Sequence, residues 1–376
     1  MNFEKYSSIV QHQLFEPWSD PISGITSYIL KQKVAPIQQS FYFTNQSFSA
    51  DGRYLWFYAA HPPAGSAEIG RTLGVADLHQ EKVIWCPETQ FRDASPFVDK
   101  DSGAVYWCWG YSVFRREPLA DAGAVLVNSI PEEVHKHRYG KRLATHLTLS
   151  ANGKEFFIDA HLGDEWCAGS LPLDGSDFVI WQTFDRCYNH AQFSPVDPDL
   201  ALIAQDWWID VATGQRSNYE NRIWLIERGK ASRPVFETAK SIAHEWWDVD
   251  GEHIWYVDYK RGTEKVSLVD FERIAVWPNG TCHSHSSRCG QFVVGDIGTY
   301  SWKNTGCRVA FYNVETGKEV DIVSNLPVPA LPRGSYHLDP HPQFCLSDSQ
   351  IVYTTTVRGS IDIALVNVRD LIDATS

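Results

Sequence analysis

The chain has 376 residues, with 33 Lys and Arg against 46 Asp and Glu, which gives a formal net charge of −13. A hydrophobic content of 43% and a charged content of 21% are ordinary for a globular protein and exclude general disorder. The sequence has no run of Lys and Arg and no apolar stretch approaching about 18 residues, so we expect neither a nucleic acid nor a membrane as partner.

The eight cysteines are scattered and form no CxxC motif. This pattern predicts buried free thiols in a reducing compartment, rather than disulfides or a zinc site. The opening MNFEKYSSIVQHQLFEPWSD has no basic segment followed by an apolar one, so no signal peptide is visible. We therefore expect a cytoplasmic location, or a periplasmic one if a signal has been removed.

One sequence unit recurs seven times along the chain. It consists of an aromatic or apolar pair, a small polar turn that often reads S-x-D-G, and an alternating strand. Most units are followed by two further strand-like runs, as at 71–86, 221–237 and 307–323. Helical periodicity is weak and is strongest at 131–143. The units begin at Phe48, Phe97, Leu149, Phe193, Trp247, His285 and Phe344.

Four short strands in each of seven units predict an all-β fold, a seven-bladed β-propeller in which residues 1–376 form a single domain. The last strand-like run, at 360–368, needs a partner, so we expect N- and C-terminal strands to pair and close the ring. A pair of β-sandwiches or an irregular all-β protein is the alternative. A propeller implies no chemistry by itself, because its function depends on the side chains around the central opening.

Candidate functional side chains concentrate in the C-terminal half. Histidines hold nearly equivalent places in four consecutive blades, so a propeller would bring their imidazoles to one axis. The CHSHS and LDPH segments place alternate side chains on one face of an extended chain, and imidazole with carboxylate suits Mn, Fe, Zn or Ni. The alternative is that these histidines only fill turns at the starts of strands. The candidates are Tyr188, His190, Arg222, His244, His283, His285, His337, Asp339 and His341.

Two other features have structural alternatives. Arg222 could have no role beyond an ion pair with a neighbouring acid such as Glu220 or Glu227. The tryptophan pairs at 207–208 and 246–247 could be sugar platforms, but we favour core positions for them.

The segment HEWWDVDGEHIWYVDYKRG, followed by CHSHSSRCGQFVVGD and DPHPQFCLSDSQIVYTTT, resembles the oligogalacturonate lyases, a family of seven-bladed propeller polysaccharide lyases. YFTNQSFSADGRYLWF is similar to the family's first blade, and NHAQFSP and NRIWLIERG are similar to its fourth and fifth. The resemblance implies that His244 is the Brønsted base and that Arg222 lies near the substrate. It places metal ligands at His283, or its neighbour His285, and at His341. Asp339 stands where the family has a further histidine, and His337 could supply the ligand that Tyr336 cannot.

What the resemblance implies is cleavage of uronic-acid oligosaccharides by metal-assisted β-elimination, on oligogalacturonate or a related uronate. We expect a divalent metal, Mn²⁺ in the first place, with Ca²⁺ or Zn²⁺ as alternatives. Tyr188, His190 or water could protonate the leaving oxygen, and we expect His244→Ala and Arg222→Ala to leave folding intact. The competing hypotheses are a glycoside hydrolase, which needs two carboxylates, and a noncatalytic propeller that binds sugar or protein.

Overall fold

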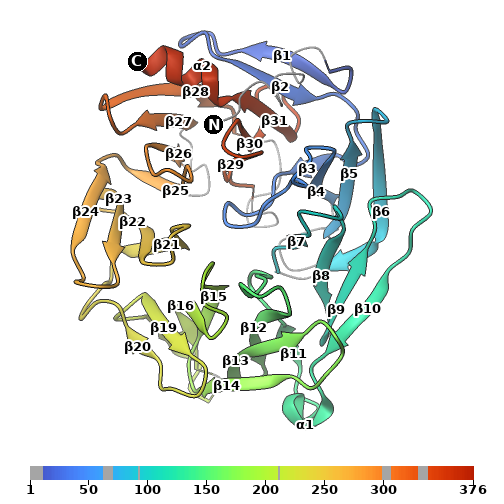
Figure 1. Ribbon diagram of the computed structural model, residues 1–376, viewed down its shortest axis with the longest axis vertical. Helices are drawn as coiled ribbons and strands as arrows, with labels where there is room; N and C mark the ends of the chain where they lie inside the picture. The colour runs from blue at the N-terminus through green and yellow to red at the C-terminus, as the bar shows by residue number, and fades with distance from the viewer. Residues whose placement is uncertain (1–11, 62–70, 92–93, 211, 299–305, 329–337) are drawn as a thin grey trace.

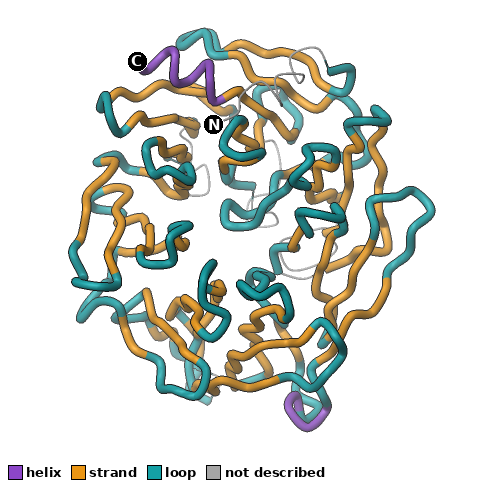
Figure 2. The backbone as a smooth tube through the Cα atoms, viewed as in Figure 1, coloured by secondary structure: helices purple, strands orange, loops and turns teal. Residues whose placement is uncertain are grey.

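The computed structural model describes residues 12–61, 71–91, 94–210, 212–298, 306–328 and 338–376. Seven β-sheets stand around a common axis like the blades of a propeller, as Figures 1 and 2 show, which confirms the predicted fold class. Helix is confined, within the described residues, to α1 (Glu132–His135) and α2 (Val368–Thr375). The helical pattern predicted at 131–143 thus forms only one turn, and a short strand follows it.

Six blades are four-stranded sheets formed by consecutive segments of the chain. Blade 1 contains β3 (Ile37–Gln39), β4 (Tyr54–Ala60), β5 (Arg71–Asp77) and β6 (Lys82–Phe91). Blade 2 contains β7 (Phe97–Val98), β8 (Val105–Trp109), β9 (Ser112–Arg116) and β10 (Val125–Ser129). Blade 3 contains β11 (Gly140–Arg142), β12 (Glu155–Leu162), β13 (Glu165–Pro172) and β14 (Val179–Phe184).

The next three blades continue the pattern. Blade 4 contains β15 (Tyr188–Phe193), β16 (Leu200–Gln205), β19 (Ile223–Glu227) and β20 (Arg233–Pro234), with the small sheet of β17 (Trp208–Ile209) and β18 (Arg216–Ser217) inserted. Blade 5 contains β21 (Ile242–Trp247), β22 (His253–Asp258), β23 (Gly262–Ser267) and β24 (Arg273–Trp277). Blade 6 contains β25 (Thr281–Ser286), β26 (Phe292–Ile297), β27 (Cys307–Asn313) and β28 (Lys318–Leu326).

The last blade combines both ends of the chain. It contains β1 (Phe15–Ser19), β2 (Thr26–Leu30), β31 (Asp362–Asn367), β30 (Gln350–Thr355) and β29 (Gln343–Cys345), in that spatial order. The antiparallel pairing of β2 with β31 sets Tyr28 opposite Leu365. N-terminal strands therefore complete the sheet that the C-terminal strands begin.

The hydrophobic core lies between the blades, because each strand directs alternate side chains toward the neighbouring sheet. Phe156, Ile158 and Ala160 of β12, for example, share one buried cluster with Cys108 and Val113 of the preceding blade. Burial of a large apolar side chain of this kind stabilises the fold by roughly 1.5–3 kcal/mol. The tight packing between blades fixes each sheet relative to the axis.

The cysteines and helices also bear on the sequence predictions. All eight cysteines are free thiols, and six of them are buried, as their scattered spacing predicted. No helix within the described residues has the length and apolar character needed to cross a membrane.

Candidate functional site

The candidate site is a ring of side chains at one equivalent position of every blade. The inner strand of each blade leads into a turn, in which Ser150 donates its N–H to Glu155 at 2.9 Å and Ser287 donates its N–H to Phe292 at 2.9 Å. In blade 7, Cys345 pairs with Gln350 at the same place. The residue four positions earlier in the chain is, from blade 1 to blade 7, Asn45, Ser95, His146, His190, His244, His283 and His341. Five of these seven residues are histidines.

Three of these histidines have left-handed backbone conformations, which is uncommon for a residue other than glycine. The φ angles are 52° at His190, 53° at His244 and 44° at His341. The inner strands β15 and β21 are irregular at the same points, between residues 189 and 192 and between residues 243 and 246. Such bulges redirect a side chain and typically cluster at functional sites.

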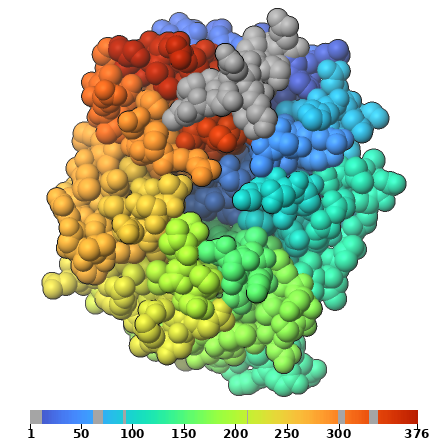
Figure 3. Space-filling model, in the orientation of Figure 1, coloured from blue at the N-terminus to red at the C-terminus, as the bar shows by residue number. Residues whose placement is uncertain are grey.

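The rings of the imidazoles converge on Tyr42, which follows β3. The centroid of its ring lies 4.5 Å from that of His146, 4.9 Å from His341, 5.9 Å from His283 and 6.0 Å from His190. In Figure 3 the surface is hollowed near its centre, and atoms of the dark-blue N-terminal part of the chain are visible at the floor. Tyr42 was absent from the residues that the sequence suggested.

His283, Asp339 and His341 form a group that could hold a metal ion, since one ligand atom from each lies within 4.8 Å of the others. The rings of His283 and His341 are 4.3 Å apart and nearly perpendicular. Two imidazoles and a carboxylate in this arrangement suit a divalent transition metal. These three residues therefore fit the predicted cofactor, a divalent metal ion.

Asp296 of β26 is hydrogen-bonded to both histidines of this group. Its carboxylate accepts hydrogen bonds from the backbone N–H of His283 at 2.8 Å, from Nδ1 of His283 at 3.0 Å and from the backbone N–H of His341 at 3.2 Å. Burial alone would lower the pKa of His283, but the Asp296 carboxylate raises it well above its ordinary value. A carboxylate bound to Nδ1 fixes the orientation of the ring and leaves Nε2 as the nitrogen that could bind a metal ion. Asp296 is the aspartate of the VGD segment and was not among the candidates from the sequence.

His244 stacks on His283, with ring centroids 4.1 Å apart. Nδ1 of His244 forms a short hydrogen bond with the backbone carbonyl of Cys282. Because a carbonyl oxygen can only accept, Nδ1 carries the proton and Nε2 presents its lone pair. The hydroxyl of the half-exposed Tyr259 lies 3.5 Å from the same Nδ1. Cys282 also belongs, with His244 and His283, to a second group of closely spaced ligand atoms.

Arg222 is 4% exposed and is held by two carboxylates. Its Nε lies 3.1 Å from Oε2 of Glu245 and its Nη1 lies 3.3 Å from Oδ2 of Asp206. Burial alone would lower the pKa of the guanidinium, but Glu245 and Asp206 together raise it. The pairing with Glu220 or Glu227 considered from the sequence is wrong, because the folded ring brings partners from β21 and from the end of β16.

His190 forms a hydrogen-bonded pair with His146, whose Nε2 lies 2.9 Å from Nδ1 of His190. Burial, with the Arg142 and Arg222 charges, lowers the pKa of His146 to about 3, and burial also lowers the pKa of His190 well below its ordinary value. Both imidazoles are therefore neutral at physiological pH. His146 was not identified from the sequence, although counting back from the LSANG turn reaches it in the same way as the others.

Two further candidates from the sequence do not join this ring, and a third lies outside the described residues. Tyr188 is 6% exposed, and its ring packs on Phe184 with centroids 4.1 Å apart in the core between blades. His285 accepts a hydrogen bond on Nδ1 from the backbone N–H of Phe344, so the structure places His283, rather than His285, at the ring position. His337 lies outside the described residues.

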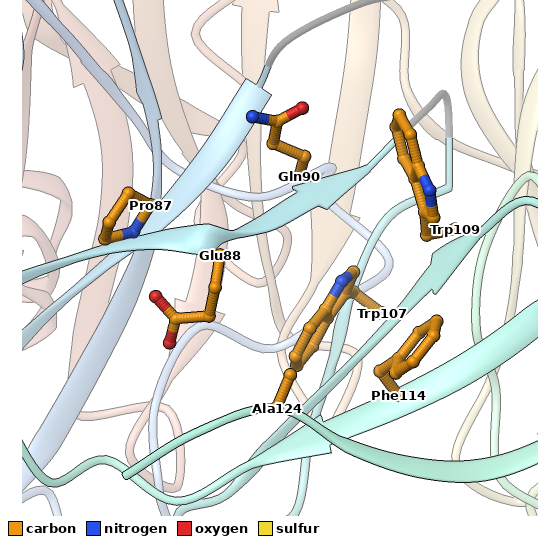
Figure 4. A pocket seen from close by; sticks show the side chains of 7 residues that line it. All are labelled: Pro87, Glu88, Gln90, Trp107, Trp109, Phe114 and Ala124. Atoms are coloured by element: carbon orange, nitrogen blue, oxygen red, sulfur yellow. The ribbon is translucent and has the colours of Figure 1, made fainter. Parts of the chain in front are cut away.

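A pocket of about 260 Å³ lies apart from the histidines, between β6 and the strands β8 and β9. Figure 4 shows the indole of Trp107 between Glu88 and Phe114. The pocket is lined by Pro87, Glu88, Gln90, Trp107, Trp109, Phe114 and Ala124.

Comparisons with known proteins agree with the resemblance seen in the motifs. No protein-family model matches the chain. It is 29% identical over 177 residues to an oligogalacturonate lyase of Dickeya dadantii, and 30% identical over 179 residues to an oligogalacturonide lyase of Pectobacterium atrosepticum. Each match covers 42% of this chain and 45% of the relative, so it spans less than half of either protein.

Solved structures extend the likeness of the fold to nearly the whole chain. An oligogalacturonate lyase in complex with manganese superposes with a TM-score of 0.73 at 18% identity, covering 94% of this chain and 96% of the other. An oligogalacturonate lyase from Vibrio parahaemolyticus superposes with a TM-score of 0.75 at 17% identity, over the same shares of both chains. In sequence over part of its length, and in fold over nearly all of it, this chain resembles the oligogalacturonate lyases.

Proposed function

We propose that this protein is a polysaccharide lyase that cleaves uronic-acid oligosaccharides by β-elimination. The observation that carries the proposal is the contact between His244 and the ligand group, in which a base imidazole stacks at 4.1 Å on His283. The names of the relatives in sequence and structure support the same reaction class.

The reaction removes the C5 proton of a 4-linked uronide and expels O4. The C5 proton is weakly acidic because the adjacent carboxylate is already negative, so positive charge at that carboxylate is the main catalytic need. A divalent metal would supply that charge as a Lewis acid when bound. We propose that His283, Asp339 and His341 hold it, and that it is Mn²⁺, with Zn²⁺ or Ca²⁺ as the alternatives.

His244 is the proposed base. Its Nδ1 is committed to the carbonyl of Cys282, which leaves Nε2 to accept the C5 proton. A positioned imidazole contributes about 10²–10⁴-fold to such a step. The oxygen of the neighbouring Tyr259 hydroxyl lies 3.5 Å from Nδ1, so its negative end can stabilise the positive charge that develops on the ring.

Arg222 is proposed to position this base. Nε and Nη2 of its guanidinium donate hydrogen bonds to the carboxylate of Glu245, the residue directly after His244, and so hold that bulge of β21 in place. To bind a sugar carboxylate itself, Arg222 would have to give up one of its two ion pairs. The pair with Asp206 is the more accessible one, because the Asp206 side chain is 20% exposed and the Glu245 side chain is 1% exposed.

His190 is the proposed donor to the leaving oxygen, in preference to Tyr188, whose ring is in the core. We propose the tautomer in which Nε2 of His146 carries a hydrogen and donates it to Nδ1 of His190. Nε2 of the neutral His190 ring then carries the other hydrogen. That N–H can donate a hydrogen bond to O4 as the C4–O4 bond breaks, while water gives O4 its proton, because a neutral imidazole is a very weak acid. The hydroxide that the water leaves then takes up the proton that His244 removed from C5.

The test is a panel of oligosaccharides built on galacturonate, on glucuronate and on ulvan-type uronates, with Mn²⁺ present. A lyase gives an unsaturated product, whose double bond conjugated with the carboxylate absorbs in the ultraviolet. A saturated product would establish a hydrolase instead, and binding without turnover would establish a noncatalytic propeller. The panel also reports stereochemistry, because C5–H and C4–O4 lie on opposite faces of galacturonate and on the same face of glucuronate.

A further inference from the structure

The small sheet of β17 and β18 is an insertion in blade 4, between the second and third strands of the blade. Trp208 pairs with Ser217 and Ile209 pairs with Arg216. It is the one two-stranded sheet within the described part of the chain, and the basic repeat of four strands does not require it.

Trp207, directly before β17, is not a core residue, contrary to the reading that we favoured from the sequence. Its side chain is 46% exposed, and the guanidinium of Arg216 lies 4.4 Å from its ring centroid. Arg216 is itself exposed and has no carboxylate partner within the described residues. An unneutralised guanidinium thus lies over one face of an exposed indole on the protein surface.

A second pair of the same kind lies nearby but differs in one respect. The guanidinium of Arg186 lies 5.6 Å from the ring centroid of Trp208. Its Nε and Nη2 are bound by the Asp185 carboxylate, at 2.9 Å and 3.2 Å. The charge of Arg186 is therefore already neutralised, which makes this pair a natural control.

The position of Trp207 connects it to the candidate site. Asp206, the preceding residue, donates its N–H to the carbonyl of Cys187 at 3.1 Å, at the end of the blade where β15 begins. Its carboxylate contacts Arg222 at 3.3 Å and accepts the N–H of Trp207 at 2.7 Å. His190 lies in β15, which Figure 1 shows beside β16 and next to the central opening. Trp207 and Arg216 are therefore on the same end of the ring as the histidines, one strand further out.

We infer that Trp207 and Arg216 form a second binding position for the acidic oligosaccharide. This position binds a uronate residue further along the same oligosaccharide than the residue that undergoes β-elimination. The indole face that Arg216 does not cover can pack against the C–H face of a pyranose, and the edge of the planar guanidinium can pair with a carboxylate through two hydrogen bonds. A chain with a net charge of −13 repels a polyanion overall, so attraction has to be local. This inference rests on the proposed function and adds a preference for longer chains to it.

The experiment measures kcat/KM for Mn²⁺-loaded enzyme on galacturonate oligomers of increasing length, starting with the dimer. Trp207→Ala and Arg216→Gln are each expected to lower kcat/KM about tenfold for long oligomers, through KM, and to leave the dimer unchanged. Arg186→Gln is expected to match the wild type at every length. The shortest oligomer that shows the effect gives the number of sugar residues between the cleaved position and the platform.

Binding is measured in parallel by calorimetry with an intact galacturonate oligomer. The protein is the His244→Ala variant, with and without Trp207→Ala, because removal of the proposed base prevents turnover during the measurement. Loss of affinity on removal of Trp207 supports the platform even if no uronide in the panel is cleaved, in which case the proposed reaction alone fails. Equal kcat/KM for all variants at all lengths, or an equal loss for the dimer, would overturn the inference.

Discussion

The sharpest prediction concerns Asp296→Asn, which tests whether a buried carboxylate orients the metal-binding histidines. Asp296 is fully buried and holds the backbone N–H of His283, the Nδ1 hydrogen of the same ring and the backbone N–H of His341. In the wild type both carboxylate oxygens accept hydrogen bonds. Asparagine keeps only one of these acceptor oxygens and replaces the other with an NH₂ group, which faces an N–H donor and cannot accept from it. One donor is left unsatisfied, which costs about 1–3 kcal/mol of folding stability.

The same substitution releases the imidazole from its fixed orientation. Loss of such an outer carboxylate typically weakens metal binding by about 10–100-fold, or roughly 1.4–2.8 kcal/mol. We expect that loss for Mn²⁺ bound to Asp296→Asn, measured by calorimetry at fixed pH, alongside the free energy of unfolding from a urea titration. Both readouts are independent of catalysis.

Asp159→Asn is the matched control. Asp159 is buried in the same way and accepts hydrogen bonds from the backbone N–H groups of Thr145 at 2.5 Å and Ala191 at 3.1 Å, but from no imidazole that we assign to the metal. We expect a similar loss of stability and no change in Mn²⁺ affinity. If Asp296→Asn binds Mn²⁺ as tightly as the wild type while losing the same stability, then Asp296 supports only the fold and our reasoning is refuted.

Three further predictions follow from the site. His244→Ala is expected to lower the rate of unsaturated product formation by at least about 10²-fold at an unchanged unfolding midpoint, and full activity would refute its role as the base. Arg222→Ala is expected to destabilise the fold by about 3–5 kcal/mol, because it leaves Glu245 charged and buried; this replaces our expectation from the sequence that folding stays intact, and restored stability in the double variant with Glu245→Gln would locate the cause. Finally, the free energy of unfolding should decrease as the pH is lowered below about 6.5, because the unfolded chain takes up a proton that His146, with its pKa lowered to about 3, does not; the loss reaches about 2 kcal/mol at pH 5 for this group, and His146→Asn should flatten the slope in urea titrations.

How far the sequence predicted the site depends on how local each signal is. The motif and repeat spacing selected His190, His244 and His341, because each precedes its turn by the same number of residues. The same count selects His146, but the alternatives at CHSHS could not be separated until β25 was seen to direct His283 toward the axis and His285 toward Phe344. His283 and His285 are two positions apart and share a face of an extended strand, so the alternation of side chains by itself does not tell which of them lies at the ring position.

The partners of these residues were beyond reach of the sequence. Arg222 meets Glu245, 23 positions away, and Tyr42 meets His341 almost three hundred positions away. Such contacts arise only when the ring closes and brings different blades to one axis. Neither composition nor spacing encodes that distance.

By itself the sequence determined that the chain is all-β, that it repeats seven times and that imidazoles recur at equivalent points, because strand alternation and turn residues act over a few neighbouring positions. Only the tertiary structure decided which imidazoles form the ligand group, that Asp296 holds them, that Glu245 and Asp206 enclose Arg222, and that Tyr188 lies in the core. These facts depend on the packing of one blade against the next, which fixes the direction of each side chain at the bulges of the inner strands.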